Sequence, residues 1–371
     1  MVLVLSNKDI ASVLDMRLCM EALDEGYRHL GDGFAVSSPR IDLLTPRRYF
    51  DPGGTAFPGC HMLKTMSGAT PKYAAIRFLT DLLYWREANG GLRRERTPET
   101  KNSYSVTRGL ILLLSVTSGE LLAILAEGHI RNLRVGAAAG LAARYLTRSD
   151  ASSVGLLGAG FMARAHLEAL SQVRKIKSVK VYSPNPDHRR RFSEETSRAI
   201  GVEIEPVNGP AAAIRKADIV VLATNALNPV IEADWIEKGM HLTCVRHCEI
   251  GKEVYAKCDT IVLNAKDNFR VWHYAARSQE AGGLPPRVLE DYERGYPPGD
   301  VTGIDWESLP DLPDLLLARH PGRTREDEMT CFDNSVGFGL QFTAVAGRTY
   351  EVAMEKGIGR DAPNDCFPDL V

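Results

Sequence analysis

The sequence predicts an α/β protein built around a doubly wound parallel sheet. From residue 152 onward, short apolar runs alternate with helical segments, and a glycine-rich turn follows the first of these runs. The length of 371 residues suggests two domains. Apolar residues make up 44% and charged residues 25% of the chain, which is ordinary for a globular protein and excludes a disordered or fibrous one.

The charge balance and the cysteines narrow the class of protein. Lys plus Arg number 45 and Asp plus Glu 47, so the net charge of −2 gives no reason to expect a nucleic acid or membrane partner. The longest strongly apolar run, residues 110–114, is too short to cross a bilayer, and we expect no secretory signal. Seven scattered cysteines without a Cys-x-x-Cys pair indicate reduced thiols in the cytoplasm and no metal site.

The first region, up to about residue 148, combines helices with strand-like runs. Apolar residues at helical spacing predict a helix over 9–29, and Ala and Gly dominate a second expected helix over 134–147. This second helix is expected to pack closely against another element or a ligand. Strands are expected over 74–83, 110–116 and 121–125, with a hairpin turn at 118–120. Charged and turn-forming residues predict an exposed loop over 87–101.

Strands and helices alternate through the second region. The expected strands cover residues 154–157, 179–182, 202–205, 219–223, 241–245 and 260–263. The expected helices cover residues 161–171, 187–200 and 211–216. This alternation predicts parallel strands joined by crossover helices. A third region, rich in Pro and Gly over 276–321, ends in an expected helix over 337–356 with Gly357 as its C-cap.

A glycine-rich turn begins the second region. Gly158, Gly160 and Ala163 match the pattern G-x-G-x-x-G/A directly after an apolar strand and at the start of a helix. Gly158 permits a tight turn, Gly160 lets the backbone approach a pyrophosphate, and the helix N-terminus favours negative charge. The pattern therefore predicts a Rossmann-type dinucleotide-binding domain. The residues of this turn expected to contact the cofactor are Gly158, Ala159, Gly160, Phe161 and Met162.

The end of the second strand bears on which dinucleotide is bound. An acidic residue there would hydrogen-bond the ribose 2′-hydroxyl of NAD. This chain has Ser183 at that point, with Asn185 and Arg189 shortly after it. These groups suit a 2′-phosphate better than a free diol, so we expect NADP(H) in preference to NAD(H). The alternative is that residues 189–191 form only a solvated helix face.

Several ordered segments together resemble the ornithine cyclodeaminase/mu-crystallin family over nearly the whole chain. They cover residues 38–40, 61–64, 117–119, 133–138, 158–160, 223–224 with Pro229, and 330–337. The resemblance implies a homodimer in which the Rossmann-type domain is inserted in an α+β substrate-binding and dimerisation domain. The expected boundaries are 1–148 for the substrate-binding domain, 149–325 for the dinucleotide-binding domain and 326–371 for a segment that returns to the first domain. Further expected cofactor contacts are Ala223, Thr224 and Asn225.

The resemblance also implies that the substrate is an amino acid or its imino or keto form. Arg40, Lys64 and Arg134 match family positions that hold the substrate carboxylate or lie near the reacting carbon. Arginine offers a planar fork to a carboxylate, and a partly buried lysine can transfer a proton. Each of these residues alone could instead belong to an ordinary surface ion pair.

Departures from the family pattern argue against ornithine cyclodeaminase itself. Where the cyclodeaminases place a catalytic Asp, this chain has Cys248 followed by Glu249. Glu249 is therefore a candidate catalytic replacement, with His247 beside it in the substrate pocket. A longer segment than the cyclodeaminases have follows Lys64, over 71–103, and is expected to reshape the pocket or its lid.

These observations predict an NAD(P)H-dependent oxidoreductase that interconverts an imino or keto acid and an amino acid, of the imine reductase or amino-acid dehydrogenase type. Two alternatives stay open. One is a redox-neutral amino-acid cyclodeaminase with tightly bound NAD. The other is a non-catalytic ligand-binding or partner subunit on the same fold, because a fold alone does not determine function.

Overall fold

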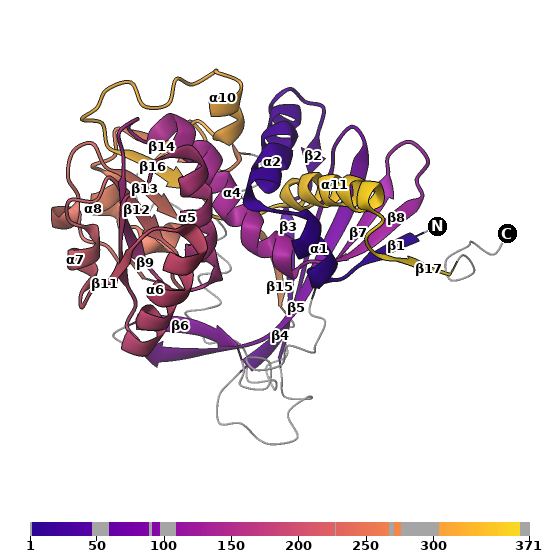
Figure 1. Cartoon of the computed structure of the whole chain (residues 1–371), viewed down its shortest axis with the longest axis horizontal. Coiled ribbons are helices and arrows are strands. Elements are labelled where there is room, and N and C mark those ends of the chain that lie inside the picture. Colours follow the sequence, from indigo (N-terminus) through magenta and orange to yellow (C-terminus); the bar gives the residue numbers. More distant parts are fainter. Residues whose placement is uncertain are drawn as a thin grey trace.

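Two sheets organise the chain, which the computed structural model describes over residues 2–46, 59–88, 91–96, 109–226, 228–266, 271–275 and 304–363. One sheet is parallel and the other is mixed, and they lie side by side with helix α4 (Gly128–Leu146) between them (Figure 1). The chain enters the mixed sheet first, builds the parallel sheet, and returns to the mixed sheet at its end.

The parallel sheet confirms the predicted fold class. Its seven strands follow the order β11-β10-β9-β12-β13-β16-β14, and every neighbouring pair is parallel. The chain order reverses between β9 and β12, which places a crevice at the carboxyl ends of these strands. The strands are β9 (Ser153–Leu157), β10 (Ser178–Tyr182), β11 (Ile204–Pro206), β12 (Ile219–Leu222), β13 (His241–Cys244), β14 (Thr260–Leu263) and β16 (Thr330–Asp333). The helices between them are α5 (Phe161–Val173), α6 (Pro186–Ile200), α7 (Pro210–Ile214) and α8 (Lys252–Tyr255).

Strand β16 is not among the strands expected from the sequence. We expect the chain from residue 326 onward to return to the first domain, but β16 pairs in parallel with β13 on one side and β14 on the other. All four of its residues are buried, so it has no alternating pattern to mark it as a strand. The return to the mixed sheet therefore begins later, with α11 (Gly339–Lys356). The domain boundary near residue 148 stays a prediction.

The mixed sheet has ten strands, with helices on one of its faces. The strand order is β15-β3-β4-β5-β7-β8-β1-β17, with β2 paired to β4 and β6 paired to β5. Helices α1 (Asn7–Val13) and α11 cover one face, and α2 (Met16–Gly31) packs against α11 and α4, with α10 (Leu312–Leu316) beside it (Figure 1). Along β4 and β7, buried residues alternate with half-exposed ones, as a sheet covered on one face requires. The strands are β1 (Val2–Leu5), β2 (Val36–Ser37), β3 (Arg40–Pro46), β4 (Gly59–Ala69), β5 (Tyr73–Ala88), β6 (Gly91–Arg96), β7 (Gly109–Ser115), β8 (Leu121–Ala126), β15 (Val271–Ala275) and β17 (Arg360–Ala362).

The long helix expected over residues 9–29 is two helices. α1 ends at Val13, and Leu14 is extended. Asp15 then caps α2, because its carboxylate accepts a hydrogen bond from the Leu18 N–H at 2.8 Å. Both helices bury their apolar faces in the same core. The helical spacing of apolar residues therefore continues from one helix to the next and does not show where the first one ends. The N-cap preference of aspartate is the signal that marks the boundary.

The segment expected as a loop over 87–101 is partly a strand. Residues 91–96 form β6, which pairs antiparallel with the end of β5. Residues 89–90 and 97–101 lie outside the described residues. Charged side chains are common on edge strands, so composition alone does not separate such a strand from a loop.

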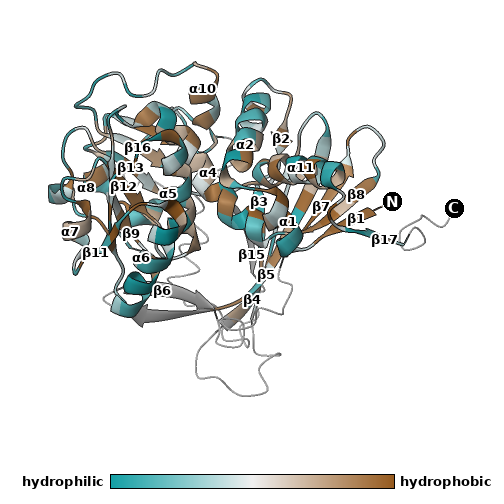
Figure 2. Ribbon diagram, in the orientation of Figure 1, coloured by the Kyte–Doolittle hydropathy of each residue, from teal (hydrophilic) through white to brown (hydrophobic). Residues whose placement is uncertain are grey.

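Helix α4 is buried on nearly every side and joins the two lobes. A Cβ on Gly136 would lie 2.3 Å from the Ala165 carbonyl oxygen, and one on Gly140 would lie 2.9 Å from the Ala169 Cβ. The Ala- and Gly-rich sequence of α4 therefore allows close packing against α5, as we expected. Figure 2 shows polar residues on the outward sides of α5 and α6.

The described residues contain neither a membrane-spanning helix nor a metal-binding cluster. None of the helices there combines the length and the apolar character that crossing a bilayer requires. No group of three or more His, Cys, Asp or Glu side chains in this part of the chain is placed to hold a metal ion. The six cysteines it contains are free thiols.

Candidate active site

The loop after β9 forms the glycine turn that the sequence predicts. Gly158 has a φ of +109°, and a Cβ there would lie 2.2 Å from the Ala223 carbonyl oxygen, so only glycine fits. Gly160 is the N-cap of α5, its side opens onto free space, and no side chain caps the helix. Phe161, the first residue of α5, is 73% exposed. The first N–H groups of α5, which include that of Met162, therefore lie at an open surface suited to a pyrophosphate.

An arginine is fixed at the carboxyl end of β10. Arg189 donates from Nη1 to the Ser183 carbonyl at 2.9 Å and from Nη2 to Asn208 Oδ1 at 2.7 Å, and its guanidinium lies 5.7 Å from the centre of the Tyr182 ring. The Asn185 side chain caps α6 by accepting hydrogen bonds from two backbone N–H groups. Arg189 is thus held at the carboxyl end of β10, whereas the Asn185 oxygen is already engaged. The contact of either residue with a dinucleotide stays a prediction.

Glu249 connects the carboxyl ends of β12 and β13. Its Oε1 accepts hydrogen bonds from the Thr224 N–H at 2.7 Å and from the Thr224 hydroxyl at 2.6 Å. Its Oε2 accepts from the N–H groups of Val245 at 3.1 Å and Arg246 at 3.0 Å. Burial raises the pKa of this carboxyl group, while its hydrogen bonds oppose the shift. Asn225 follows Thr224 and is exposed.

These contacts argue against the catalytic role that the sequence suggests for Glu249. Four donors already occupy its two oxygens, so the carboxylate holds two strand ends in place and has little capacity left for a substrate proton. The sequence indicates the residue type at this position but not the backbone groups that surround it. These contacts favour a structural role for Glu249 at the carboxyl edge of the parallel sheet, called the cofactor edge below, and its catalytic role stays a prediction.

The residues before Glu249 lie in a 3₁₀ turn, His247–Glu249. Burial lowers the pKa of His247 to about 4, so its imidazole is neutral at pH 7. Burial raises the pKa of the Cys248 thiol to about 11, and its Sγ donates to the Ala226 carbonyl at 3.6 Å. Both side chains are uncharged at neutral pH and can line a pocket, so the substrate-lining role of His247 stays a prediction.

Arg134 is a buried cation where α4 meets the two sheets. It is 9% exposed, Nη1 donates to Gln341 Oε1, and the guanidinium lies 5.0 Å from the centre of the Phe342 ring. Its Nε has no hydrogen-bond partner among the described residues. A Cβ on Gly337 would lie 1.9 Å from Nη1, so glycine leaves the space that the guanidinium fills. Burial, then the charge of Arg77, lowers the pKa of Arg134 to about 10, which keeps it charged at pH 7.

Arg40 and Lys64 lie on neighbouring strands of the mixed sheet. Arg40 donates to both oxygens of Asp42, from Nε at 2.8 Å and also from Nη2, so Asp42 occupies much of its fork. Asp42 is the cross-strand partner of Lys64 between β3 and β4. Lys64 is 9% exposed and lies on the buried face of the sheet together with Met62 and Met66. Both candidate substrate residues therefore share one small part of the helix-covered face.

Arg77 is a buried cation of the same face that the sequence analysis does not identify. It donates to Glu127 Oε2 from Nε at 2.9 Å and from Nη2 at 2.7 Å, and Arg131 donates to Glu127 Oε1 at 2.8 Å. Its Nη1 lies 3.9 Å from the Met66 sulfur, and its guanidinium is 4.9 Å from the centre of the Phe342 ring. A single arginine in an apolar strand is the only signal for it, and that signal names no partner.

The predicted residues thus form two groups that meet at α4. The cofactor group lies at the carboxyl edge of the parallel sheet, around Gly158. The substrate group comprises Lys64, on the buried face of the mixed sheet, and Arg134, on α4. Asn334, which follows β16, donates from Nδ2 to the Val135 carbonyl of α4 at 2.8 Å and so connects the two groups.

A glycine turn at a topological switch point, with a buried guanidinium near the same sheet edge, is typical of two-domain enzymes that use a dinucleotide. The chain belongs to the ornithine cyclodeaminase/mu-crystallin family, whose model matches residues 94–357. This match confirms the resemblance found in the sequence.

Individual relatives include amino-acid and imino-acid enzymes. The chain is 26% identical over 363 residues to the alanine dehydrogenase of Archaeoglobus fulgidus, covering 96% of this chain and 97% of that protein. It is 28% identical over 256 residues to a Δ(1)-pyrroline-2-carboxylate reductase of Bacillus cereus, covering 68% and 73%. Among solved structures, the Thermococcus litoralis Δ(1)-pyrroline-2-carboxylate reductase in complex with NADH and L-proline has a TM-score of 0.76 and 25% identity, covering 97% of this chain and 100% of that one.

The structural role of Glu249 predicts the effect of Glu249→Gln. The amide keeps the size of the side chain but turns an NH₂ group toward N–H donors. We expect the free energy of unfolding, measured in urea, to fall by about 1–3 kcal/mol, as for a buried donor left without an acceptor. The control is Glu253→Gln on the exposed side of α8, which should leave stability unchanged. Unchanged stability of Glu249→Gln together with lost turnover would restore the catalytic role.

Proposed function

We propose that the protein is an NAD(P)H-dependent oxidoreductase that interconverts an imino or keto acid and an amino acid. The observation that carries the proposal is the guanidinium of Arg134, buried beside the cofactor edge with an unpartnered Nε among the described residues. A buried cation of this kind is suited to an anionic ligand such as a substrate carboxylate. The family and its alanine dehydrogenase and pyrroline-2-carboxylate reductase members support the substrate class.

The residues around the glycine turn fit a dinucleotide. A Cβ on Gly158 would collide with the Ala223 carbonyl, so the turn there is tight. Gly160 faces open space at the N-terminus of α5. A dinucleotide bound there would supply or accept a hydride. The backbone of the turn would hold the pyrophosphate, and Ala223 and Thr224 would lie against the cofactor from the end of β12.

The substrate residues then have distinct tasks. Arg134 binds the carboxylate, and Arg40, paired with Asp42, adds positive charge on the same face of the mixed sheet. Lys64 donates a proton to the nitrogen or oxygen of the reacting group in the reductive direction, because an ammonium group can act as a general acid. His247, neutral at pH 7, lines the pocket without adding charge.

Replacement of Lys64 tests the assignment of the proton donor. We expect Lys64→Met to lower kcat by about 100-fold or more, the contribution typical of a general acid, while the Kd of the cofactor stays within twofold. The matched control is Lys72→Met, because Lys72 is exposed and pairs with Glu351. Turnover is followed at 340 nm with pyruvate, glyoxylate or oxaloacetate plus ammonia or methylamine, and with pyrroline- and piperideine-2-carboxylate.

The outcome of this assay separates the proposal from its alternatives. Oxidation of NADPH or NADH with any of these compounds supports the reductase, and unchanged turnover of Lys64→Met contradicts the role of Lys64. Ammonia release from a diamino acid without net change at 340 nm would instead indicate a cyclodeaminase. Cofactor binding with no turnover would indicate a binding subunit.

We further propose that NADP(H) is preferred over NAD(H), because Arg189 is anchored at the end of β10 and Ser183 stands where an acidic residue would exclude a 2′-phosphate. We expect Arg189→Ala to weaken NADPH binding by about tenfold or more, the loss typical of a charge-assisted hydrogen bond, and to leave NADH binding within twofold. Arg190→Ala, which removes an exposed arginine paired with Asp187, is the control. A wild-type protein that binds NADH more tightly than NADPH would contradict the preference.

The open face of the mixed sheet supports a homodimer. Apolar side chains on the face opposite the helices stay partly exposed, among them Leu43 at 40% and Ile76 at 39%. A contiguous apolar surface of this kind is typical of an interface between subunits. Other half-exposed apolar residues of this face are Leu63, Phe78, Leu82, Leu110, Leu112 and Leu114.

Light scattering coupled to size exclusion tests the dimer. We expect a particle of twice the 40.8 kDa chain mass, and we expect Ile76→Glu to shift it to the monomer, because a charge on this face would be buried unpaired. Met354→Glu, at an exposed position of α11, is the control. A wild-type monomer, or a dimer that tolerates Ile76→Glu, would show that this face is not the interface.

A further inference from the structure

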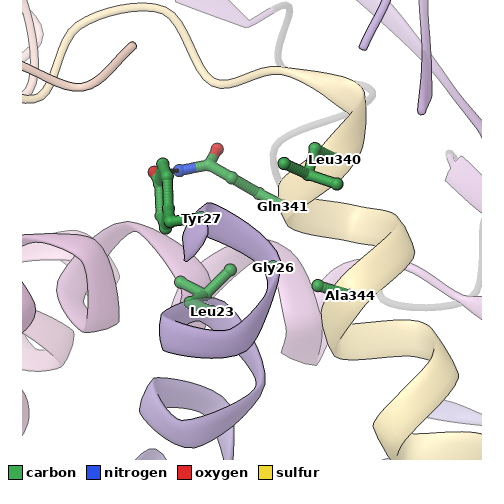
Figure 3. Close-up of a pocket in the computed structure, with 6 residues that line it drawn as sticks. All are labelled: Leu23, Gly26, Tyr27, Leu340, Gln341 and Ala344. Carbon is green, nitrogen blue, oxygen red and sulfur yellow. Dashed lines mark hydrogen bonds between the residues drawn. The ribbon is translucent and has the colours of Figure 1, made fainter. Parts of the chain in front are cut away.

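A chain of buried hydrogen bonds runs from Arg134 to the parallel sheet. Arg134 Nη1 donates to Gln341 Oε1, and Gln341 Nε2 donates to the Tyr27 hydroxyl at 2.8 Å. The Tyr27 hydroxyl donates to Oδ1 of Asn264, the residue that follows β14. Figure 3 shows the side chains of Tyr27, on α2, and Gln341, on α11, directed toward each other. This series of hydrogen bonds therefore joins residues of α4, α11 and α2 and ends at the parallel sheet, which carries the cofactor edge.

The chemistry of the groups fixes the direction of each hydrogen bond. Arginine only donates, so the Gln341 oxygen faces Arg134 and its NH₂ group faces Tyr27. The Tyr27 hydroxyl accepts from that NH₂ group and must give its own proton to Asn264. The Asn264 NH₂ group is then left to donate to the Val336 carbonyl, at 3.3 Å. Only one orientation of each side chain completes the set.

Burial makes these hydrogen bonds hard to replace. Tyr27, Gln341 and Asn264 are each 1% exposed, so water has no easy access to their polar groups. Burial also raises the pKa of Tyr27, which keeps the hydroxyl protonated and able to donate.

Asn264, the last residue in this series of hydrogen bonds, contacts a strained backbone segment beside Arg134. Val336 has a φ of +57°, which is rare for a β-branched residue, and its carbonyl is the acceptor for Asn264. Gly337 comes next, and its backbone lies against the Arg134 guanidinium. The hydrogen-bond chain thus reaches Arg134 from two sides, directly through Gln341 and indirectly through the backbone after β16.

We propose that Tyr27 is a positioning residue for substrate binding. It fixes the amide of Gln341, which holds the Arg134 guanidinium so that its Nε stays available for the substrate carboxylate. Through Asn264, the same hydroxyl keeps Arg134 at a fixed place relative to the cofactor edge. This inference rests on the proposed function, in which Arg134 binds the carboxylate.

Tyr27→Phe tests the proposal through kinetics. The variant leaves the Gln341 NH₂ group without its acceptor, so the amide can turn away from Arg134. We expect the KM for the amino or imino acid to rise by about tenfold, which corresponds to the loss of one hydrogen bond between Arg134 and the substrate carboxylate. We expect kcat to stay within threefold and the Kd of NADPH to stay unchanged. The matched control is Tyr73→Phe, which removes a tyrosine hydroxyl that donates to Glu351 at 3.2 Å in the same lobe. It should leave the KM within twofold.

A second readout needs no substrate. In crystal structures we expect the Arg134 guanidinium to leave its wild-type orientation in Tyr27→Phe but not in Tyr73→Phe. An unmoved Arg134 with an unchanged KM and a lower Tm would mean that Tyr27 only stabilises the fold, and would overturn the proposal. If the wild-type protein turns over none of the test compounds, the proposed function fails, while the crystal structures still decide the role of Tyr27.

Gln341→Glu provides a variant of nearly the same shape in case Tyr27→Phe does not fold. The new carboxylate would pair with Arg134 and compete with the substrate carboxylate. We expect the KM to rise more than tenfold, as for a guanidinium already neutralised by a close partner, with the Kd of NADPH unchanged. An unchanged KM would show that Gln341 does not control Arg134, and would also overturn the proposal.

Discussion

One buried guanidinium sets the conditions for the structure around it. Arg134 projects from α4 between the two sheets, where a charge persists only if space and polar partners are prepared for it. Gly337 leaves the space, Phe342 offers the face of its ring, and Gln341 accepts a hydrogen bond. Helix α4 can carry this residue to the junction because its glycines let α5 approach closely.

The two arginines that pack on Phe342 differ in how their charges are compensated. Arg77 donates two hydrogen bonds to Glu127, and the same carboxylate also pairs with Arg131. Arg77 therefore has an anionic partner, which it shares with Arg131. Among the described residues, Arg134 donates a hydrogen bond to the oxygen of a neutral amide, that of Gln341. Burial lowers the pKa of Arg134 to about 10. A bound carboxylate would supply negative charge beside Arg134, as the proposed function requires.

Features with local signals could be predicted from the sequence. The turn at Gly158 and the C-cap at Gly357 require glycine for their backbone angles, and the alternation of strands and helices marks the parallel sheet. Features that depend on distant contacts could not be predicted. Tyr27 and Asn264 are separated by 237 positions in the chain, and nothing in either neighbourhood indicates the other. Strand β16 lies in the sheet between β13 and β14, which both precede it in the sequence. All of its residues are buried, so it shows no alternation of apolar and polar residues.

The contacts of Glu249 bear on the choice between cyclisation and reduction. A carboxylate near the end of β13 is suited to accept a proton from a substrate amine, but four hydrogen bonds already engage this one. The neighbouring imidazole and thiol of His247 and Cys248 are neutral at pH 7. A cyclisation needs a base to free the amine, whereas reduction of an imine needs an acid that delivers a proton. In the proposed function, Lys64 on the buried face of the mixed sheet supplies that acid. The occupied carboxylate of Glu249 and this lysine together favour reduction over cyclisation.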